Sequence, residues 1–501
     1  NDGAGPEPQR DALMMPPRMP QETTEHEGAP AGAVPPLVAH LLGRDRAAQA
    51  VSPAPSADGR TEWRLGLVAL VFLMAFGAVA LRMSTLALTG PSEPRVASTT
   101  TRATVSRAAI TDRHGQPLAL TLPAWSVYAH PRELDDAPRA AERLARVLDG
   151  VSADTLTSRF ARSTAFAWIK RPVTPAERQA VHDLGIPGVY FGTREVRVYP
   201  AGRTAAHILG GVRDGQEDVH QTEVLGLAGI ERHHDETLRD PARDGEPLRL
   251  SIDLAAQAAL TETLRAGVER FNAIAAAGVL LNARTGQVLA MTSLPDFDPN
   301  NRPVPTDPEI ASTKPLLNRA AQGVYEMGST FKPFYAALAL EKGVVGPETL
   351  IDAKGPMRWG RHTIRDYYHM PPLMTVAEAM ARSSNVVTAR LAIDLGTPAV
   401  RAWLAQLGLT DAIPLEVAEA SLGQPLLPDR WADISTITIG FGYGLAVTPL
   451  HMAAGYAALV NGGLKITPTL DPDVAAPGEE ARILSPATSL EMRKILRQVV
   501  E

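Results

Sequence analysis

The sequence predicts a multidomain protein of mixed α/β class that carries one membrane-spanning helix near its N-terminus. Three observations support this prediction. The chain has 501 residues, which is too long for a single hydrophobic core, so two or three domains are expected. A continuous apolar run covers Leu65 to Leu81. Past Gly245, strand-like and helix-like patterns follow one another closely, as in a domain built from both kinds of element.

The first segment, residues 1–61, is rich in Pro, Ala, Gly and charge and has little apolar periodicity. Such a segment cannot bury enough apolar surface to offset its ordering entropy, so we expect a disordered tail. Residues 62–88 are expected to form the transmembrane helix, because the apolar run between Arg64 and Arg82 reaches the lower end of the length that spans a bilayer. A buried core helix is the alternative. Arginines flank the span on both sides, so charge alone does not orient it.

Two further regions follow the span. Residues 95–245 mix short β-like runs (127–129 and 189–191) with a charged helical stretch at 137–148, and show no catalytic cluster. In residues 246–501, we expect a strand at 248–252 and a helix at 254–271. A hairpin should follow, pairing 278–281 with 287–291 around a Thr285-Gly286 turn. The last 17 residues, 485–501, have the pattern of an amphipathic helix with Leu490, Ile495, Leu496 and Val499 on its apolar side.

Composition excludes several classes of function. The net charge of -6 leaves no basic surface for nucleic acid, so nucleic-acid partners are not expected. The absence of cysteine excludes disulfides, thiolate nucleophiles and thiolate metal sites. Two groups of residues could be considered as metal ligands, His233-His234-Asp235 and the set His362, Asp366 and His369. Because neighbouring side chains diverge, we expect surface or hydrogen-bonding roles for both groups and no metal site.

A Ser-x-x-Lys pattern at Ser329 and Lys332 is the first candidate for catalytic chemistry. Pro333 is tolerated only in the first turn of a helix, so the helix through Phe334 should begin near Ser329. The serine would then lie at the positive end of the helix dipole, where its N–H could bind an oxyanion. Lys332 would share its face one turn on, and a desolvated lysine can act as a general base. The alternative is a helix cap beside a solvated lysine.

A second candidate is the Ser-x-Asn pattern at Ser383 and Asn385, which lies between two helical stretches. A hydroxyl and an amide at that spacing could face the Ser/Lys pair and a substrate peptide bond. Alone, the pattern is more typical of a helix-helix connection than of a catalytic motif. Following Ser329-x-x-Lys332 in the chain, it matches the first two motifs of penicillin-recognising serine enzymes.

From Arg107 onward the chain resembles the class B penicillin-binding proteins. The segments that carry the resemblance, in the family's order, are Arg107–Gly115, Arg197–Gly202 with Ala205–His207, Gly229–Glu231, Ser251–Asp253, Pro295–Asn300 and Phe441–Leu450. Asn385 and the Gly442-Tyr443-Gly444 turn favour the division branch, the septal FtsI type, over the elongation branch.

The resemblance implies a penicillin-binding transpeptidase domain over 246–501, with helices around an antiparallel sheet, on an elongated α+β pedestal over 95–245. It implies a serine D-Ala-D-Ala transpeptidase that crosslinks peptidoglycan stem peptides and reacts with β-lactams. Ser329 would be the nucleophile, Lys332 its base, Ser383 a proton relay and Asn385 a substrate-orienting residue. No metal or organic cofactor is implied.

The resemblance also implies a place in the cell. The protein would be a single-pass protein of the bacterial inner membrane, with residues 1–61 in the cytoplasm and the catalytic domain in the periplasm. Divisome membrane proteins would be its partners, including an FtsW-like glycosyltransferase of the SEDS type.

One departure from the family concerns its third motif, Lys-Thr-Gly, which is absent from these 501 residues. In the family, the strand that carries it supplies the second oxyanion donor. We therefore expect the transpeptidase domain to be incomplete here and the native chain to continue to that motif. Three alternatives stay open: an elongation-type enzyme, a hydrolase such as a β-lactamase or carboxypeptidase on the same fold, and a catalytically incomplete division scaffold or β-lactam-binding protein.

Overall fold

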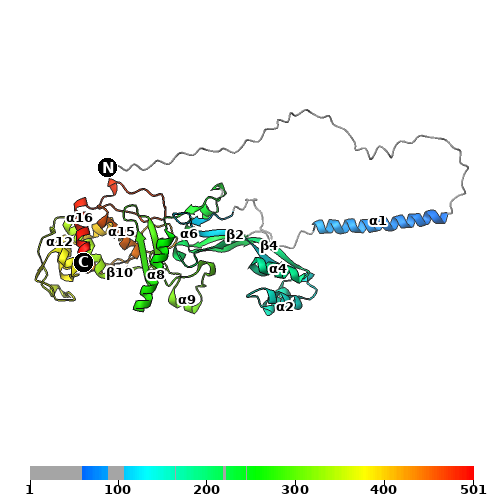
Figure 1. Ribbon diagram of the computed structural model, residues 1–501, viewed down its shortest axis with the longest axis horizontal. Coiled ribbons are helices and arrows are strands. Elements are labelled where there is room, and N and C mark those ends of the chain that lie inside the picture. The colour runs from blue at the N-terminus through cyan, green and yellow to red at the C-terminus, as the bar shows by residue number, and fades with distance from the viewer. Residues whose placement is uncertain (1–58, 89–105, 164, 218–221, 244, 501) are drawn as a thin grey trace, which may run out of the picture. The chain divides into compact units, whose positions relative to one another are not determined.

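The computed structural model describes residues 59–88, 106–163, 165–217, 222–243 and 245–500. They belong to two units, Asn1–Gly90 and Pro91–Glu501. In the first unit, the described residues form one helix, α1 (Gly59–Leu88) (Figure 1). It begins three residues before the predicted start at residue 62, and the rest of the predicted tail lies outside the described residues.

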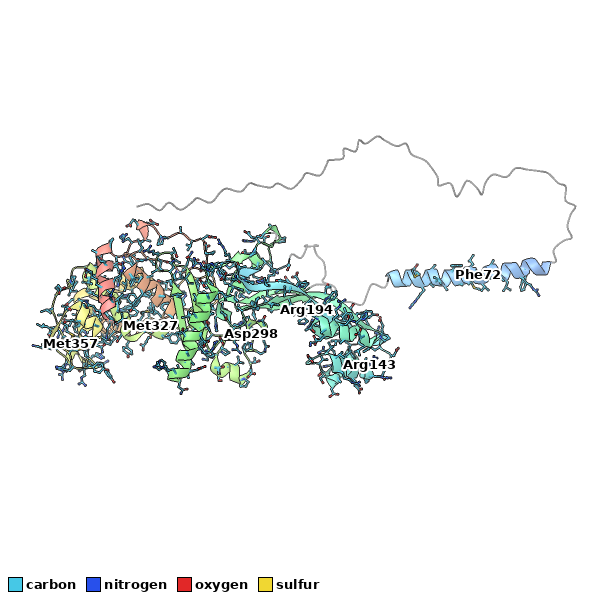
Figure 2. All side chains as sticks on the ribbon, in the orientation of Figure 1. Phe72, Arg143, Arg194, Asp298, Met327 and Met357 are labelled. Carbon is cyan, nitrogen blue, oxygen red and sulfur yellow. The ribbon has the colours of Figure 1, made fainter. Side chains whose placement is uncertain are left out.

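The stretch Gly66–Ser84 of α1 is 19 residues long, has a mean hydropathy of 2.2 and is not buried. Its apolar side chains, Phe72 among them, are exposed (Figure 2). Burying such a surface in water-free surroundings is strongly favourable, and the length matches a bilayer core. Within the part of the chain that the structure describes, this is the one helix long and apolar enough to cross a membrane.

The second unit begins with a five-stranded sheet whose centre is the long strand β2 (Pro117–Ala129). Strand β2 pairs antiparallel with β3, with β4 and, near its start, with β1. The other strands are β1 (Ile110–Thr111), β3 (Ala167–Val173), β4 (Val189–Val198) and β7 (Leu248–Arg249). Alternate residues of β2, Val127 and Ala129 among them, are buried in a core formed with three helices. These helices are α2 (Ala137–Val147), α3 (Ala153–Arg162) and α4 (Pro175–Leu184).

A buried cluster of charged side chains connects Arg107, just before β1, with Glu231, which lies after β4 in the chain. The guanidinium Nε atoms of Arg107 and Arg197 bind opposite oxygens of the Glu231 carboxylate, at 2.6 and 2.7 Å. Tyr199 also donates to Glu231, and burial raises the pKa of this phenol well above its usual range. Glu231 lies on α6 (Gly229–His233), which follows the hairpin of β5 (Gly211–Glu217) and β6 (Thr222–Ala228). Short helices α5 (Ala206–Leu209) and α7 (Asp235–Leu238) flank this hairpin in the chain.

One core is shared between the residues before 245 and those after it. It includes Ile110, Tyr199 and Ile230 from the first part, and Val288 and Leu450 from the second. Strand β7, from the part after residue 245, also joins the sheet of the first part, because it pairs in parallel with β1.

The predicted helix and hairpin after Gly245 are confirmed. Helix α8 spans Leu254–Phe271 and is capped by Asp253, whose carboxylate accepts from the N–H groups of Ala255 and Ala256. Strands β8 (Ala276–Leu281) and β9 (Val288–Leu294) pair antiparallel, with Val279 opposite Met291. Helix α8 lies beside these two strands (Figure 1). The fold class is therefore mixed α/β, as predicted.

The largest core lies further along the chain and is mainly helical. Helix α10 (Lys332–Glu341) is buried at its centre, with Phe334 and Tyr335 at 0% exposure. The other helices of this part are α9 (Pro308–Thr313), α11 (Val376–Ala381), α12 (Asn385–Leu395), α13 (Thr397–Gln406), α14 (Asp433–Gly440), α15 (Pro449–Val460) and α16 (Pro486–Gln498). Three short antiparallel pairs join them: β10 (Tyr325–Glu326) with β15 (Ala446–Val447), β11 (Ile351–Asp352) with β14 (Leu373–Met374), and β12 (Met357–Trp359) with β13 (His362–Ile364).

Candidate active site

Ser329 lies in a short helical turn, Gly328–Phe331, that leads directly into α10. The predicted helix start near Ser329 is therefore confirmed, and Pro333 occupies the first turn of α10. Strand β10 ends just before this turn, and the Ser329 residue is exposed. The serine thus projects to the surface from the point where a paired strand changes into a buried helix.

The turn is held from outside by the Gly442-Tyr443-Gly444 segment. The Gly328 N–H donates to the Gly442 carbonyl oxygen at 3.2 Å, and the Gly444 N–H donates to Glu326 Oε1 at 2.7 Å. Gly442 has a φ of +87°, and a Cβ there would meet the Gly328 oxygen at 1.9 Å. Only glycine allows this conformation and this approach together.

Lys332 is buried, with 2% of its surface exposed. Its Nζ lies 3.1 Å from Ser329 Oγ, 2.8 Å from Ser383 Oγ and 2.6 Å from the Ser383 carbonyl oxygen. Burial lowers the pKa of this amine from 10.5 to about 8, although the negative charge of Asp366 acts in the opposite direction. At neutral pH an appreciable fraction of the amine is therefore unprotonated and able to accept a proton.

Ser383 lies in the connection between α11 and α12 and has a φ of +59°. This left-handed conformation is uncommon for a residue with a Cβ. It lets the carbonyl and the hydroxyl of one residue both accept from Lys332 Nζ. The structure thus brings three of the four predicted site residues, Ser329, Lys332 and Ser383, into one hydrogen-bonded group.

Asn385, the fourth predicted site residue, is the first residue of α12. It is partly exposed, and its side-chain Nδ2 donates to the Arg365 carbonyl oxygen at 3.0 Å. Its amide is therefore bound to the segment before α11, while Ser383, two residues earlier, faces the lysine.

Asp366 is a contributor to this region that the sequence did not identify as one. Its Oδ2 accepts from the Ser384 hydroxyl at 3.0 Å, and its Oδ1 accepts from the N–H groups of Asn385 and Val386. The sequence placed Asp366 only in a possible metal-binding set with His362 and His369. A carboxylate shortly before a Ser-Ser-Asn helix start was the one available signal, and it is a weak one.

The described residues contain no group of three or more His, Cys, Asp or Glu side chains that could hold a metal ion. In the first candidate set, Asp235 binds Arg107 and Arg239. In the second, the carboxylate of Asp366 is engaged by the start of α12. Asp235 and Asp366 thus have hydrogen-bonding roles of the predicted kind, and the absence of a metal from both sets stays a prediction.

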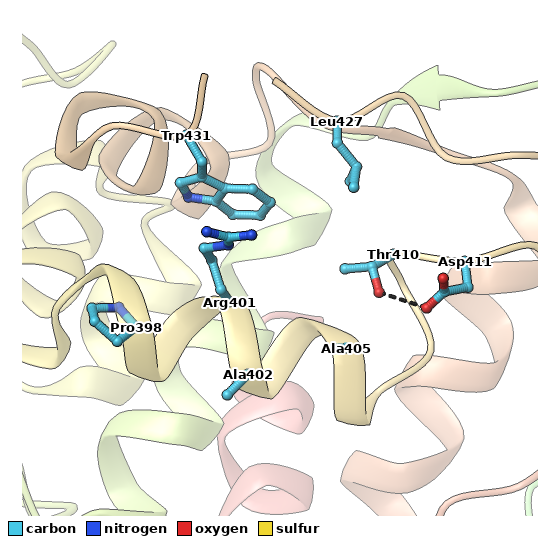
Figure 3. Close-up of a pocket in the computed structure, with 8 residues that line it drawn as sticks. All are labelled: Pro398, Arg401, Ala402, Ala405, Thr410, Asp411, Leu427 and Trp431. Carbon is cyan, nitrogen blue, oxygen red and sulfur yellow. Dashed lines mark hydrogen bonds between the residues drawn. The ribbon is translucent and has the colours of Figure 1, made fainter. Parts of the chain in front are cut away.

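A separate hollow of about 510 Å³ lies between α13 and the segment before α14 (Figure 3). Its lining includes Arg401, stacked over the Trp431 ring at 5.3 Å, and Thr410, hydrogen-bonded to Asp411. None of the four predicted site residues lines it.

Comparison with known protein families assigns most of the chain. Residues 276–501 match the penicillin-binding protein transpeptidase domain, and residues 102–243 match the penicillin-binding protein dimerisation domain. A serine and a buried lysine one turn apart, in a transpeptidase domain that follows a dimerisation domain, define a penicillin-binding protein.

Curated relatives identify the branch. A probable peptidoglycan D,D-transpeptidase FtsI of Caulobacter vibrioides is 38% identical over 78% of this chain and 64% of the relative. The peptidoglycan D,D-transpeptidase FtsI of Escherichia coli is 30% identical over 83% of this chain and 74% of the relative. A probable peptidoglycan D,D-transpeptidase PenA of Neisseria meningitidis is 30% identical over 89% of this chain and 79% of the relative. The chain belongs to the class B penicillin-binding proteins, in the septal FtsI-type branch.

The chain thus spans about two-thirds of the length of its Caulobacter relative. Family membership and helix α1 together indicate a membrane-anchored protein.

Proposed function

We propose that this protein is a serine D,D-transpeptidase that crosslinks peptidoglycan stem peptides during cell division. The observation that carries the proposal is the position of Lys332 Nζ, which contacts both Ser329 Oγ at 3.1 Å and Ser383 Oγ at 2.8 Å. A buried amine between two hydroxyls can take a proton from one and return it through the other.

Acylation begins with neutral Lys332. Its amine accepts the Ser329 hydroxyl proton as Ser329 Oγ attacks the carbonyl carbon between the two terminal D-Ala residues of a donor stem peptide. The N–H of Ser329, in the first turn before α10, stabilises the developing oxyanion. The C–N bond then breaks, and the leaving D-Ala amine takes its proton from Lys332 through the Ser383 hydroxyl.

Transfer reverses these proton movements. An amine of a neighbouring stem peptide attacks the ester carbonyl and gives one proton, through Ser383, to Lys332. The ester C–O bond breaks, an amide crosslink forms, and the proton returns to Ser329 Oγ. Asn385 orients the donor peptide from the start of α12. A β-lactam would acylate Ser329 by the same first step, because its strained amide takes the place of the D-Ala-D-Ala bond.

The proposed division of labour along the chain follows the family matches. Residues 95–245 form the pedestal and residues 246–501 the transpeptidase domain, supported by the matches at 102–243 and 276–501. Helix α1 anchors the protein in the bacterial inner membrane, with the catalytic part in the periplasm, where peptidoglycan lies. Partners in the same membrane would be divisome proteins, including an FtsW-like glycosyltransferase that makes the glycan strands.

A covalent labelling experiment tests the acyl-enzyme. The protein expressed from its full gene is pulsed with a β-lactam, measured intact by mass spectrometry and then mapped by peptide. We expect one adduct, on the peptide that contains Ser329, and none in Ser329→Ala. Ser421→Ala, at an exposed serine elsewhere in the same part of the chain, serves as the matched control and should label normally. An adduct on a peptide without Ser329 contradicts the assignment.

A further inference from the structure

Ser383 lies in the short connection between α11 and α12. Ser383 has a left-handed backbone conformation that costs a residue with a Cβ on the order of 1 kcal/mol or more. Such a conformation persists only where neighbouring contacts fix it. On its N-terminal side, the Ser383 N–H donates to the Met380 carbonyl oxygen at 3.1 Å, and the Ser384 N–H donates to Ala379. These bonds close the end of α11 and leave the start of α12 to be fixed separately.

Asp366 supplies that second set of contacts. One carboxylate accepts from three consecutive residues, from the Ser384 hydroxyl and from the backbone N–H groups of Asn385 and Val386. Ser384 is fully buried and itself accepts from the Val387 N–H at 3.1 Å. The carboxylate also lies at the start of an 11-residue helix, where a negatively charged side chain stabilises the helix.

We propose that Asp366 is a positioning residue for the catalytic group, because its carboxylate fixes the start of α12 and so holds Ser383 with both oxygens toward Lys332 Nζ. This inference rests on the proposed function and deepens it. Within the described part of the chain, Asp366 makes no hydrogen bond to Ser329 or to Lys332. It acts through residues 384–386, which directly follow the proton relay in the chain.

The charge of Asp366 has a second effect, on the amine. Its negative charge raises the pKa of Lys332 against the larger effect of burial, which lowers it to about 8. Removing the charge while keeping an acceptor oxygen should therefore lower the pKa of Lys332 further. A purely structural cap would have no such effect, so the pH profile separates the two roles.

The test compares three variants by the rate constant of β-lactam acylation at Ser329, using the protein expressed from its full gene. Asp366→Ala removes all three hydrogen bonds and should lower the rate constant at least about tenfold, a smaller effect than the roughly hundredfold or more that follows from losing a proton-transfer group outright. Asp366→Asn keeps the shape and an acceptor oxygen, and its pH profile should move to lower pH. Asp253→Ala is the control, because Asp253 also caps a helix through two N–H groups, those of Ala255 and Ala256.

The outcomes separate the possible failures. A parent protein that acquires no adduct at Ser329 refutes the proposed function. A labelled parent with an Asp366→Ala variant that reacts at the parental rate leaves that function intact and refutes the role of Asp366. If Asp366→Ala does not fold, Asp366→Asn decides: a profile moved to lower pH supports the role, and an unchanged profile refutes it. Asp253→Ala should acylate within about twofold of the parental rate constant. If Asp253→Ala lowered the rate constant as much as Asp366→Ala does, the loss of any helix cap would have this effect, and the positioning role of Asp366 would be refuted.

Discussion

Gly442 lies directly against Gly328, the residue before the candidate nucleophile: a Cβ at position 442 would meet the Gly328 carbonyl oxygen at 1.9 Å. The Gly328 N–H also donates to the Gly442 carbonyl oxygen at 3.2 Å. Two turns that are far apart in the sequence therefore contact each other through their backbones, and the position of Ser329 depends on that contact.

Gly442→Ala should displace the turn that carries Ser329. The substitution adds a methyl group where a backbone oxygen already lies and where φ is +87°. We expect β-lactam acylation to slow by more than about tenfold, since small displacements of a nucleophile are costly. Gly462→Ala is the control: its φ is +96°, but a Cβ there would have nothing within 4 Å. Equal acylation by both variants would contradict the prediction.

Glu231→Gln should destabilise the fold far more than its distance from Ser329 suggests. Glu231 is 0% exposed and binds the guanidinium groups of Arg107 and Arg197, both also buried. Neutralising it takes from buried Arg197 the counter-charge of Glu231 and leaves Arg107 paired with Asp235 alone. Breaking a buried ion pair in this way costs about 3–5 kcal/mol. The free energy of unfolding in urea measures this.

The control is Glu246→Gln, at an exposed carboxylate that pairs with Arg243 at 3.1 Å. Exposed pairs contribute at most about 1 kcal/mol, so this variant should unfold almost as the parent does. A Glu231→Gln variant within about 1 kcal/mol of the parent would show that the buried cluster is not a stabilising centre.

Local patterns predicted the elements well. The helix at Leu254–Phe271 and the hairpin of β8 and β9 were predictable because periodicity and turn residues act over a few neighbouring positions. The helix at the end of the chain was also found, and its apolar side was predicted in part. Ile495 is buried and Leu496 packs against the core, as expected. Leu490 and Val499, expected on the same side, are 51% and 47% exposed, whereas Met492 is buried. Which face of a helix is buried depends on the helices packed against it, and a 13-residue stretch does not contain that information.

In the candidate site, too, contacts between residues near in sequence were predictable and contacts between distant residues were not. Ser329 and Lys332 are one helical turn apart, so their proximity followed from spacing. Asp366 is 18 residues from Ser384 and Glu231 is 124 from Arg107, so their contacts arise only when the chain folds. The left-handed conformation of Ser383 was not predictable either, because no glycine or turn motif marks it.

The orientation in the membrane can be tested by fusion. If the catalytic part lies in the periplasm, a reporter active only there should give signal when fused after Gly90, beyond the apolar stretch Gly66–Ser84. The same reporter fused after Ala50, before the span, should be silent. The reverse pattern would place the catalytic part in the cytoplasm and remove peptidoglycan as a substrate.

Lys332 gives the most direct test of mechanism through pH. Burial lowers the pKa of its amine from 10.5 to about 8, and the amine must be neutral to accept the Ser329 proton. The acylation rate constant should therefore rise with pH up to about 8 and then level off. Because the folded-state pKa lies below the unfolded value, the unfolded chain binds the extra proton between about 8 and 10.5, so this lysine's contribution to stability rises with pH over that window.

Lys332→Ala should remove the pH dependence and slow acylation by at least about a hundredfold, the usual scale for losing a general base. Ser383→Ala should slow it less, because a water molecule can replace a relay more readily than a base. Lys342→Ala, at the exposed C-terminal end of the same helix, should behave as the parent and controls for losing a positive charge from α10. Acylation is followed by stopped-flow or mass spectrometry from pH 6 to pH 10. A Lys332→Ala variant that acylates at the parental rate, or keeps the parental pH profile, would show that another group is the base.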